Sequence, residues 1–256
     1  MPRMSRNAAE GDDAAVVADL TMGTKLTFIA LLPIIIFMTA LGPDIAHALF
    51  AYGSFSPQAA HLLGMTISAS SFTLIPYALV MLHLRVFYAR EEAWTPTFII
   101  AGITGTKILL SALAPYIAQD PSHVVVLLGA ANGFGFVAGA LIGALLLRRK
   151  LGTLRSSDVL RTSIWAVAAA LVGVAVIFGV RWLLRDVAGL HLPQALGRLI
   201  GAPSLGNLIE VVLLGLLFLV VTGLVLSRSK LPEVQNLGRA LQRIPCLLYT
   251  SDAADE

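Results

Sequence analysis

Six long apolar blocks constrain the fold of this chain more than any other feature. They cover roughly residues 26–50, 62–84, 98–117, 124–147, 164–184 and 208–226. Each is close to the ~20 residues that a helix needs to cross a ~30 Å hydrocarbon layer. A transmembrane barrel would instead show ~10-residue stretches of alternating polarity, which this sequence lacks. The pattern predicts an all-α, polytopic membrane protein with six transmembrane helices.

The composition agrees with a chain whose solvent is lipid. Of the residues 57% are hydrophobic and 13% are charged, with a mean hydropathy of +0.83, whereas a soluble domain carries about a quarter charged residues. The first block follows about 25 largely polar residues, an opening that does not resemble a signal peptide. Histidines and carboxylates do not cluster at metal-ligand spacing, and no nucleophile motif is present. We therefore expect no catalytic residues, no metal, no cofactor and no nucleic-acid partner.

The distribution of basic residues predicts the orientation. If both ends and alternate loops share one side of the membrane, that side carries 14 of the 18 Lys and Arg residues. Lys and Arg in short loops stay on the cytoplasmic side. The sequence thus predicts a multi-pass membrane protein with both ends in the cytoplasm. The other side carries Arg181, Arg185 and Arg198, which would meet anionic headgroups or cap helix ends.

Three stretches resemble one family. Residues 1–12 begin Met-Pro-Arg-Met-Ser, residues 49–55 read Leu-Phe-Ala-Tyr-Gly-Ser-Phe, and residues 85–96 read Arg-Val-Phe-Tyr-Ala-Arg-Glu-Glu-Ala-Trp-Thr-Pro. In this order, with the observed number of spans between them, they resemble the second half of the MurJ (MviN) flippases of the MOP exporter superfamily. One departure is Glu92, where the family commonly has Asp. The positions that carry the likeness are Pro2, Arg3, Ser5, Phe87, Tyr88, Ala89, Arg90, Thr95 and Pro96.

The resemblance implies a function and a missing part. The chain would correspond to helices 9–14 of a 14-helix transporter that moves the lipid-linked peptidoglycan precursor, lipid II, by alternating access. Its partners would be an undecaprenyl-diphosphate-linked substrate, membrane lipids and the absent N-terminal helices. Residues 1–150 would form four helices of the C-terminal lobe. Residues 151–230 would form the last two helices, which in the family hold the lipid tail. Alternatives are another exporter of the superfamily, such as a polysaccharide exporter or a drug–cation antiporter, and a membrane scaffold without transport.

The last residues stand apart from the rest of the chain. Residues 231–245 are expected to begin a cytoplasmic tail. Residues 246–256, which include the single cysteine Cys246, resemble a translated sequencing adapter and are excluded from fold reasoning.

Four individual features suggest function or packing within the spans. Lys107 lies near mid-membrane, where a Lys costs roughly 2.5–3.5 kcal/mol on insertion scales. It is expected either to face a cavity as a site for the substrate diphosphate or to make a structural contact. Glu210 lies near the outer end of the sixth block, where it could couple to an ion or proton or simply reach water. Gly42-Pro43 suggests that the first span breaks and restarts. Glycines four residues apart predict close helix packing in the fourth span, at Gly135, Gly139 and Gly143, with Gly129 beyond them.

The link at residues 85–96 also has a direct physical interpretation. Phe87 and Tyr88 are predicted to lie at the membrane interface, which aromatic rings favour. Arg85 and Arg90 are predicted to contact lipid phosphates. Thr95 followed by Pro96 predicts a helix start, with Pro at the first helical position.

Overall fold

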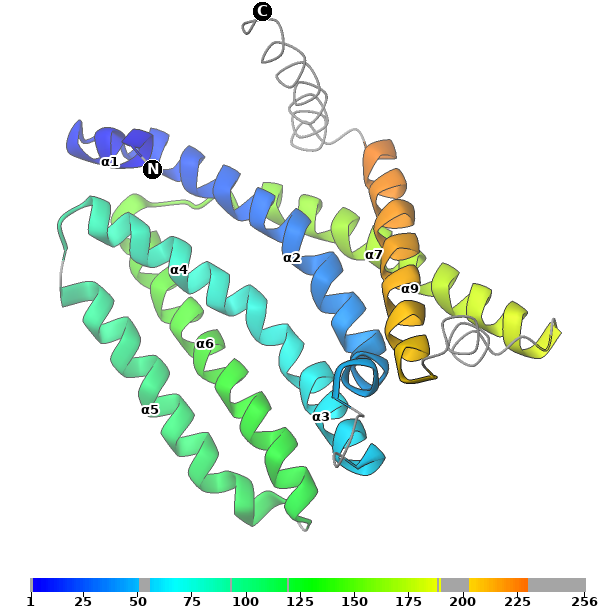
Figure 1. The fold of residues 1–256 in the computed structure, drawn as a ribbon. Coiled ribbons are helices and arrows are strands. Elements are labelled where there is room, and N and C mark those ends of the chain that lie inside the picture. The colour runs from blue at the N-terminus through cyan, green and yellow to red at the C-terminus, as the bar shows by residue number, and fades with distance from the viewer. Residues whose placement is uncertain are drawn as a thin grey trace, which may run out of the picture.

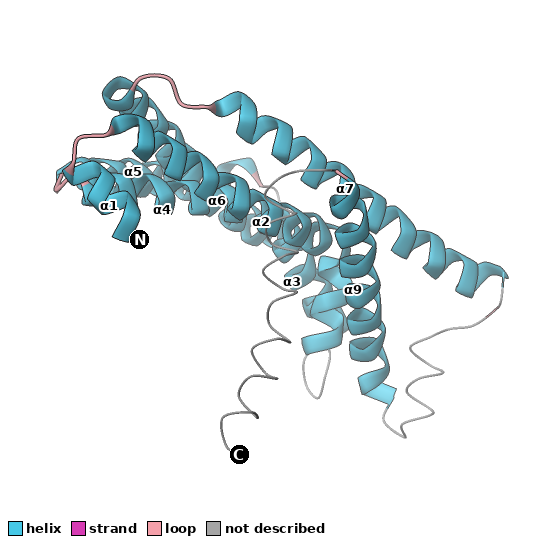
Figure 2. Cartoon of the chain, turned by 90° about the horizontal axis from the view of Figure 1, so that it is seen from above, coloured by secondary structure: helices cyan, strands magenta, loops and turns pink. Residues whose placement is uncertain are grey.

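The computed structural model describes residues 2–50, 56–92, 94–118, 120–187, 189 and 203–229. These residues form helices α1 (Pro2–Ala9), α2 (Asp13–Phe50), α3 (Pro57–Ser70), α4 (Leu74–Ala89), α5 (Trp94–Ile117), α6 (Pro121–Leu151), α7 (Ser156–Trp182) and α9 (Pro203–Arg228), shown in Figure 1. A 3-10 turn, η1 (Ser71–Thr73), joins α3 to α4, and a π-turn, η2 (Leu183–Val187), continues α7. Figure 2 shows no strand among the described residues.

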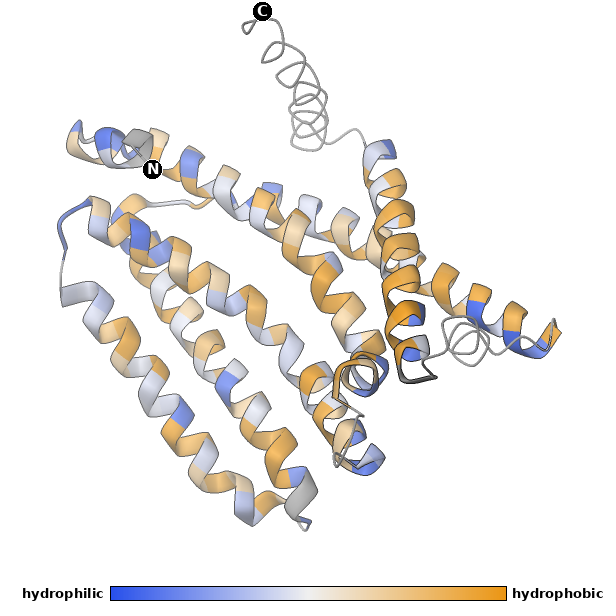
Figure 3. Cartoon of the chain, viewed as in Figure 1, coloured by the Kyte–Doolittle hydropathy of each residue, from blue (hydrophilic) through white to orange (hydrophobic). Residues whose placement is uncertain are grey.

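The six predicted spans are confirmed within the described residues. Helices long and apolar enough to cross a membrane cover Asp13–Phe50, Pro57–Ala89, Trp94–Ile117, His123–Leu151, Ser156–Val187 and Leu205–Arg228. Hydrophobic residues predominate along these helices, although single hydrophilic residues also lie in the middle of α5 and α6 (Figure 3). Because each helix satisfies its own backbone hydrogen bonds, such segments are stable in lipid.

Local signals fix where several helices begin. The Asp12 carboxylate accepts a hydrogen bond from the Ala15 amide at 2.9 Å, which caps the start of α2. The Ser56 hydroxyl accepts one from Ala59 at 3.2 Å, and Pro57 occupies the first turn of α3. The cap at Asp12 lies well before the apolar block, so α2 extends beyond the predicted start of the first span.

Helix α2 is the element around which the others pack. It contacts α3 and α4 on one side and α7 and α9 on the other, while α5 packs mainly against α6 (Figure 1). One buried cluster joins α2 to α4, α5 and α6, and two further clusters join α2 to α7 and α9. The two groups of helices therefore share α2 as a common wall.

The predicted packing role of the fourth-span glycines is confirmed. A Cβ at Gly139 would collide with Ile103 of α5, and one at Gly143 would lie 2.7 Å from Nδ1 of His83 in α4. A Cβ at Gly135 would collide with the side chain of Lys107. The glycine stripe of α6 lets α4 and α5 approach closely, as small residues do between membrane helices.

The expected break at Gly42-Pro43 is wrong, because α2 continues to Phe50 with Pro43 inside it. A Cβ at Gly42 would lie 2.6 Å from the carbonyl oxygen of Gly64, so this glycine marks the crossing of α2 and α3. The Ser68 hydroxyl donates to the carbonyl of Met38 at 3.4 Å, next to the carbonyl that Pro43 deprives of its helical donor. Close packing thus accommodates the proline without a break.

A short helix precedes the first span. Residues 2–9, part of the first stretch that resembles the family, form α1. A turn at Gly11, with φ of +72°, then leads into α2. Residues 49–55, the second stretch that resembles the family, lie mostly outside the described residues. Residues 231–256 also lie outside them.

Candidate functional site

Polar side chains gather at three places in this apolar fold. One group lies where α2, α6 and the α4–α5 link meet, and we call it the link cluster: Asp13, Arg90, Glu92 and Lys150. A second place is Lys107, in the middle of α5. The third lies at the other end of the molecule from the link cluster, where the ends of α2 and α7 meet the first part of α9. We call it the far cluster: Asp44, Arg181, Arg185 and Glu210.

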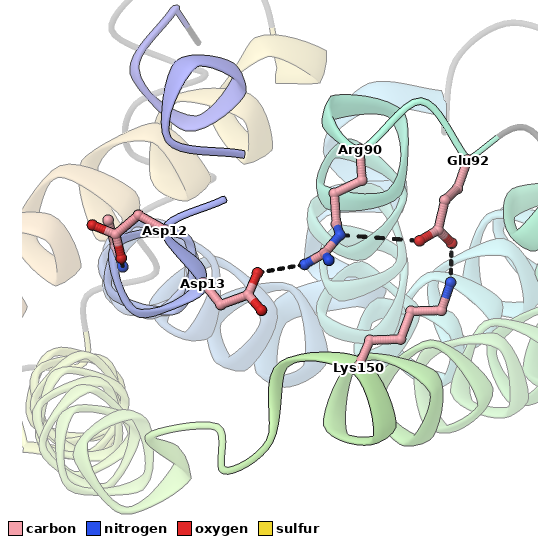
Figure 4. Close-up of polar contacts among 6 residues, drawn as sticks. Asp12, Asp13, Arg90, Glu92 and Lys150 are labelled. Atoms are coloured by element: carbon pink, nitrogen blue, oxygen red, sulfur yellow. Dashed lines mark hydrogen bonds and ion pairs between the residues drawn. The ribbon is translucent and has the colours of Figure 1, made fainter. Parts of the chain in front are cut away.

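The link cluster is a chain of ion pairs across three elements (Figure 4). Arg90 Nη1 lies 2.6 Å from Asp13 Oδ1, and Arg90 Nε lies 4.0 Å from Glu92 Oε1. The ammonium of Lys150, at the end of α6, pairs with Glu92 Oε2. The cluster therefore joins the start of α2, the link after α4 and the end of α6.

Glu92 is the centre of this cluster. Partial burial raises the pKa of Glu92, but hydrogen bonds from Lys150 and Thr95, together with the charges of Lys150 and Arg90, bring it below its ordinary value. The Thr95 hydroxyl donates to Glu92 Oε2 at 2.9 Å. Two cations and a hydroxyl thus stabilise the ionised form of this carboxylate.

The structure corrects three predictions about the link. Phe87 is 0% exposed and belongs to the core cluster, so its interfacial placement is wrong, whereas Tyr88 is 59% exposed. Arg90 pairs with Asp13, a protein carboxylate. Helix α5 begins at Trp94, two residues before the predicted first helical position Pro96, and the Thr95 hydroxyl donates to Glu92. Phe87 is buried because α2 and α6 cover the end of α4, which the sequence of the link does not reveal.

The remaining motif positions take simpler places. Pro2 and Arg3 lie in α1, with side chains outside the described residues, and Ser5 is an exposed residue of the same helix. Ala89 is the last residue of α4, and Pro96 is fully buried in the first turn of α5.

Lys107 is half-buried in the middle of α5 and contacts an aromatic ring. Its Nζ lies 3.8 Å from the centre of the Phe136 ring in α6, a cation–π contact. Phe136 in turn packs edge-on against Tyr77 of α4, with ring centres 5.1 Å apart. Among the described residues no carboxylate pairs with Lys107. Its positive charge is therefore partly stabilised by the ring and is not neutralised there.

The far cluster joins three helices through one guanidinium. Arg181 of α7 donates two hydrogen bonds to the Asp44 carboxylate of α2, at 2.8 and 2.7 Å. Its Nε lies 3.3 Å from Glu210 Oε1 of α9. Arg185, on the π-turn η2, lies 3.9 Å from the same Glu210 oxygen. These side chains, with His47 and Asn207, line a polar cavity of about 280 Å³.

The expectation that Glu210 simply reaches water is wrong, because Glu210 is only 4% exposed. Arg181 was predicted to meet headgroups or cap a helix, but it pairs with Asp44, 137 positions earlier in the chain. An ionised carboxylate that is buried away from water needs a compensating cation or strong hydrogen bonds. Acidic and basic residues near the ends of the apolar blocks were the sequence feature that indicated ion pairs here. The sequence does not show which of these residues would meet. Arg198 lies outside the described residues.

Within the described residues, no group of three or more His, Cys, Asp or Glu side chains is placed to hold a metal ion. In the part of the chain that the structure describes, charged clusters thus lie at both ends of the helices, and Lys107 lies in the middle of α5.

Comparisons with known proteins agree on one family. The sequence model described as "Lipid II flippase MurJ" matches residues 1–193. A "Probable lipid II flippase MurJ" of Synechocystis sp. is 26% identical over 243 residues, covering 94% of this chain and 42% of that protein. A solved structure titled "Lipid II flippase MurJ, inward closed conformation" superposes with a TM-score of 0.58 at 16% identity, over 86% of this chain and 41% of the other.

The structural match supports the fold, and the family match supports the assignment. The chain spans about two fifths of the length of the curated relative that it matches. Since the family model covers well over half of the sequence, the chain belongs to the MurJ family.

Proposed function

We propose that this chain is part of a flippase that moves a lipid-linked peptidoglycan precursor across the bacterial plasma membrane by alternating access. The observation that carries the proposal is the match of residues 1–193 to the MurJ family. The six spans and the matching fold of a lipid II flippase add support. Because the relative is more than twice as long, we propose that further helices of the complete protein supply the rest of the substrate cavity.

The experiment is complementation of a bacterium whose own lipid II flippase is depleted. The complete natural protein should restore growth and the appearance of lipid II on the outer face. Failure to restore either, with the protein present in the membrane, would contradict the proposal. Residues 1–245 alone are expected not to flip lipid II in liposomes, since half of the cavity would be absent, and transport by that segment would overturn this expectation.

Lys107 is our proposed contact for the substrate diphosphate. Its charge lies in mid-span, without a carboxylate partner among the described residues, and its cation–π contact leaves ammonium hydrogens for a further acceptor. A hydrogen bond to a charged group contributes about 1.5–3 kcal/mol, so Lys107→Met should slow transport by about 10–100-fold. Lys107→Arg is the matched control that keeps the charge. Undiminished transport by Lys107→Met in the complete protein would remove Lys107 from the proposal.

Glu210 is proposed as a counter-ion that keeps α9 attached to α7 and α2. Its burial and its contacts to Arg181 and Arg185 support this role. Coupling to a transported ion or proton is the competing role for the same carboxylate. If Glu210→Gln abolishes the dependence of transport on a proton or sodium gradient, the coupling role is correct and ours is not.

The orientation is proposed from the basic loops, with both ends of the chain in the cytoplasm. The surface around the link cluster carries Arg148, Arg149 and Lys150, consistent with the cytoplasmic side. The test introduces a single cysteine in place of Arg149 or of Asp120, at the two ends of α6, and treats intact cells with an impermeant thiol reagent. We expect the cysteine at position 120 to be labelled and the cysteine at position 149 to be protected. The opposite result would reverse the orientation.

A further inference from the structure

A cavity of about 300 Å³ lies between α2, α4 and the beginning of α7. Neither Lys107 nor any residue of the far cluster lines it. Its walls come from Leu20, Thr21, Thr24 and Phe28 of α2, Leu79 and His83 of α4, and Leu154, Arg155, Ser156, Val159, Leu160 and Ser163 around the start of α7.

Most of the wall is apolar, because the hydroxyl groups of three polar lining residues are already hydrogen-bonded within their own helices. The hydroxyls of Thr21, Thr24 and Ser163 donate to helix carbonyls, with distances of 2.7, 2.8 and 2.8 Å. Because these hydroxyls are occupied by their own helices, the threonines contribute mainly methyl groups to the wall. Together with the leucine and phenylalanine side chains, this makes a surface suited to a hydrocarbon chain.

One polar side chain in the wall is not satisfied. His83 is only 6% exposed, its ring packs against Gly143 of α6, and its Nδ1 has no hydrogen-bond partner among the described residues. A buried polar group without a partner carries a desolvation cost of about 1–3 kcal/mol. Because Nδ1 lies against Gly143 of α6, a helix that does not line the cavity, we do not assign it a contact with the occupant of the cavity.

The mouth of the cavity is basic. Arg155, at the joint between α6 and α7, lines it, and Arg148, Arg149 and Arg161 are exposed on the adjoining helix ends. Asp158 is the one acidic residue in the first turn of α7. Asp13 of α2 lines a second cavity together with Arg155, but its carboxylate is paired with Arg90. The remaining excess of cations beside an apolar cavity matches a molecule with an anionic head and a hydrocarbon tail.

We propose that this cavity binds an anionic phospholipid of the surrounding bilayer. One acyl chain fills the space between α2, α4 and α7, and the lipid phosphate pairs with Arg155. The site is separate from the proposed substrate contact at Lys107 and does not rest on the flippase proposal.

The test uses the complete natural protein in phosphatidylcholine nanodiscs that contain a little phosphatidylglycerol with a photoactivatable group in one acyl chain. After illumination, mass spectrometry of the digested protein locates the labelled residues. Label is expected to concentrate on α2, α4 and α7 at the cavity. Arg155→Gln should lower that label about fivefold, the loss expected for one basic residue near an anionic headgroup. Arg85→Gln is the matched control, which removes an exposed arginine of α4 that does not line the cavity.

Two further arms decide between occupants. Ser163→Phe, which fills the cavity without changing charge, should also remove the label, with folding verified by thermal unfolding. A phosphatidylcholine probe and an isoprenyl phosphate probe are tested in parallel. The proposal is overturned if label spreads over all lipid-facing helices, if Arg85→Gln has the same effect as Arg155→Gln, or if only the isoprenyl probe labels the cavity.

Discussion

Removal of Arg181 is the perturbation whose effect the structure predicts most directly. Arg181→Met removes two hydrogen bonds to Asp44. It also removes the cation nearest to the buried carboxylate of Glu210. Removing one partner of a buried ion pair destabilises a protein by about 3–5 kcal/mol, because the remaining charge stays unpaired. Arg185 remains 3.9 Å from Glu210 and is 42% exposed, so we expect a value near the lower limit, about 3 kcal/mol.

Thermal unfolding in nanodiscs measures this change. For a chain of this size about 1 kcal/mol corresponds to 2–4 °C, so Arg181→Met should lower the Tm by about 6–12 °C. Arg161→Met is the matched control, since Arg161 is an exposed arginine of the same helix. It should change the Tm by less than about 2 °C.

A combined variant separates loss of the cation from loss of packing. Arg181→Met with Asp44→Asn and Glu210→Gln removes the unpaired charges, and replacing a complete buried ion network is often neutral. The combined variant should therefore recover most of the lost Tm. The reasoning fails if Arg181→Met unfolds at the same temperature as the Arg161 control, or if the combined variant is less stable than Arg181→Met alone.

Two further predictions concern the link cluster and the crossing of α2 with α3. The pKa of Glu92 is lower in the folded chain than its ordinary value of 4.5, so its stabilising effect is present above pH 4.5 and is lost as the pH falls through the folded-state pKa. Glu92→Gln should lower the free energy of unfolding at pH 7 by about 1 kcal/mol. In the variant this free energy should also fall less steeply as the pH is lowered, measured by denaturant titration. An unchanged pH profile would contradict this. Gly42→Leu should separate α2 from α3 at Gly64 and lower stability by more than about 3 kcal/mol, whereas Gly105→Leu, with open space around its Cβ position, should have little effect in the same unfolding assay.

The sequence predicted the spans well because each membrane helix is nearly an independent unit. Length and hydropathy decide whether a segment is stable in lipid, and both are local properties. The glycine stripe of α6 was also visible, since its spacing belongs to one helix. The family likeness at the α4–α5 link needed no tertiary information either.

Tertiary structure decided which polar groups meet and which apolar residues are buried. Asp44 and Arg181 are separated by 137 positions, and their pairing depends on how α7 and α9 pack against α2. Phe87 lies at a helix end that would face lipid if α2 and α6 did not cover it, and Gly42-Pro43 stays helical because α3 packs against it. In lipid the hydrophobic effect does not distinguish a protein neighbour from a hydrocarbon chain. Composition therefore determined that these helices cross the membrane, while side-chain shape and buried charge determined how they pack together.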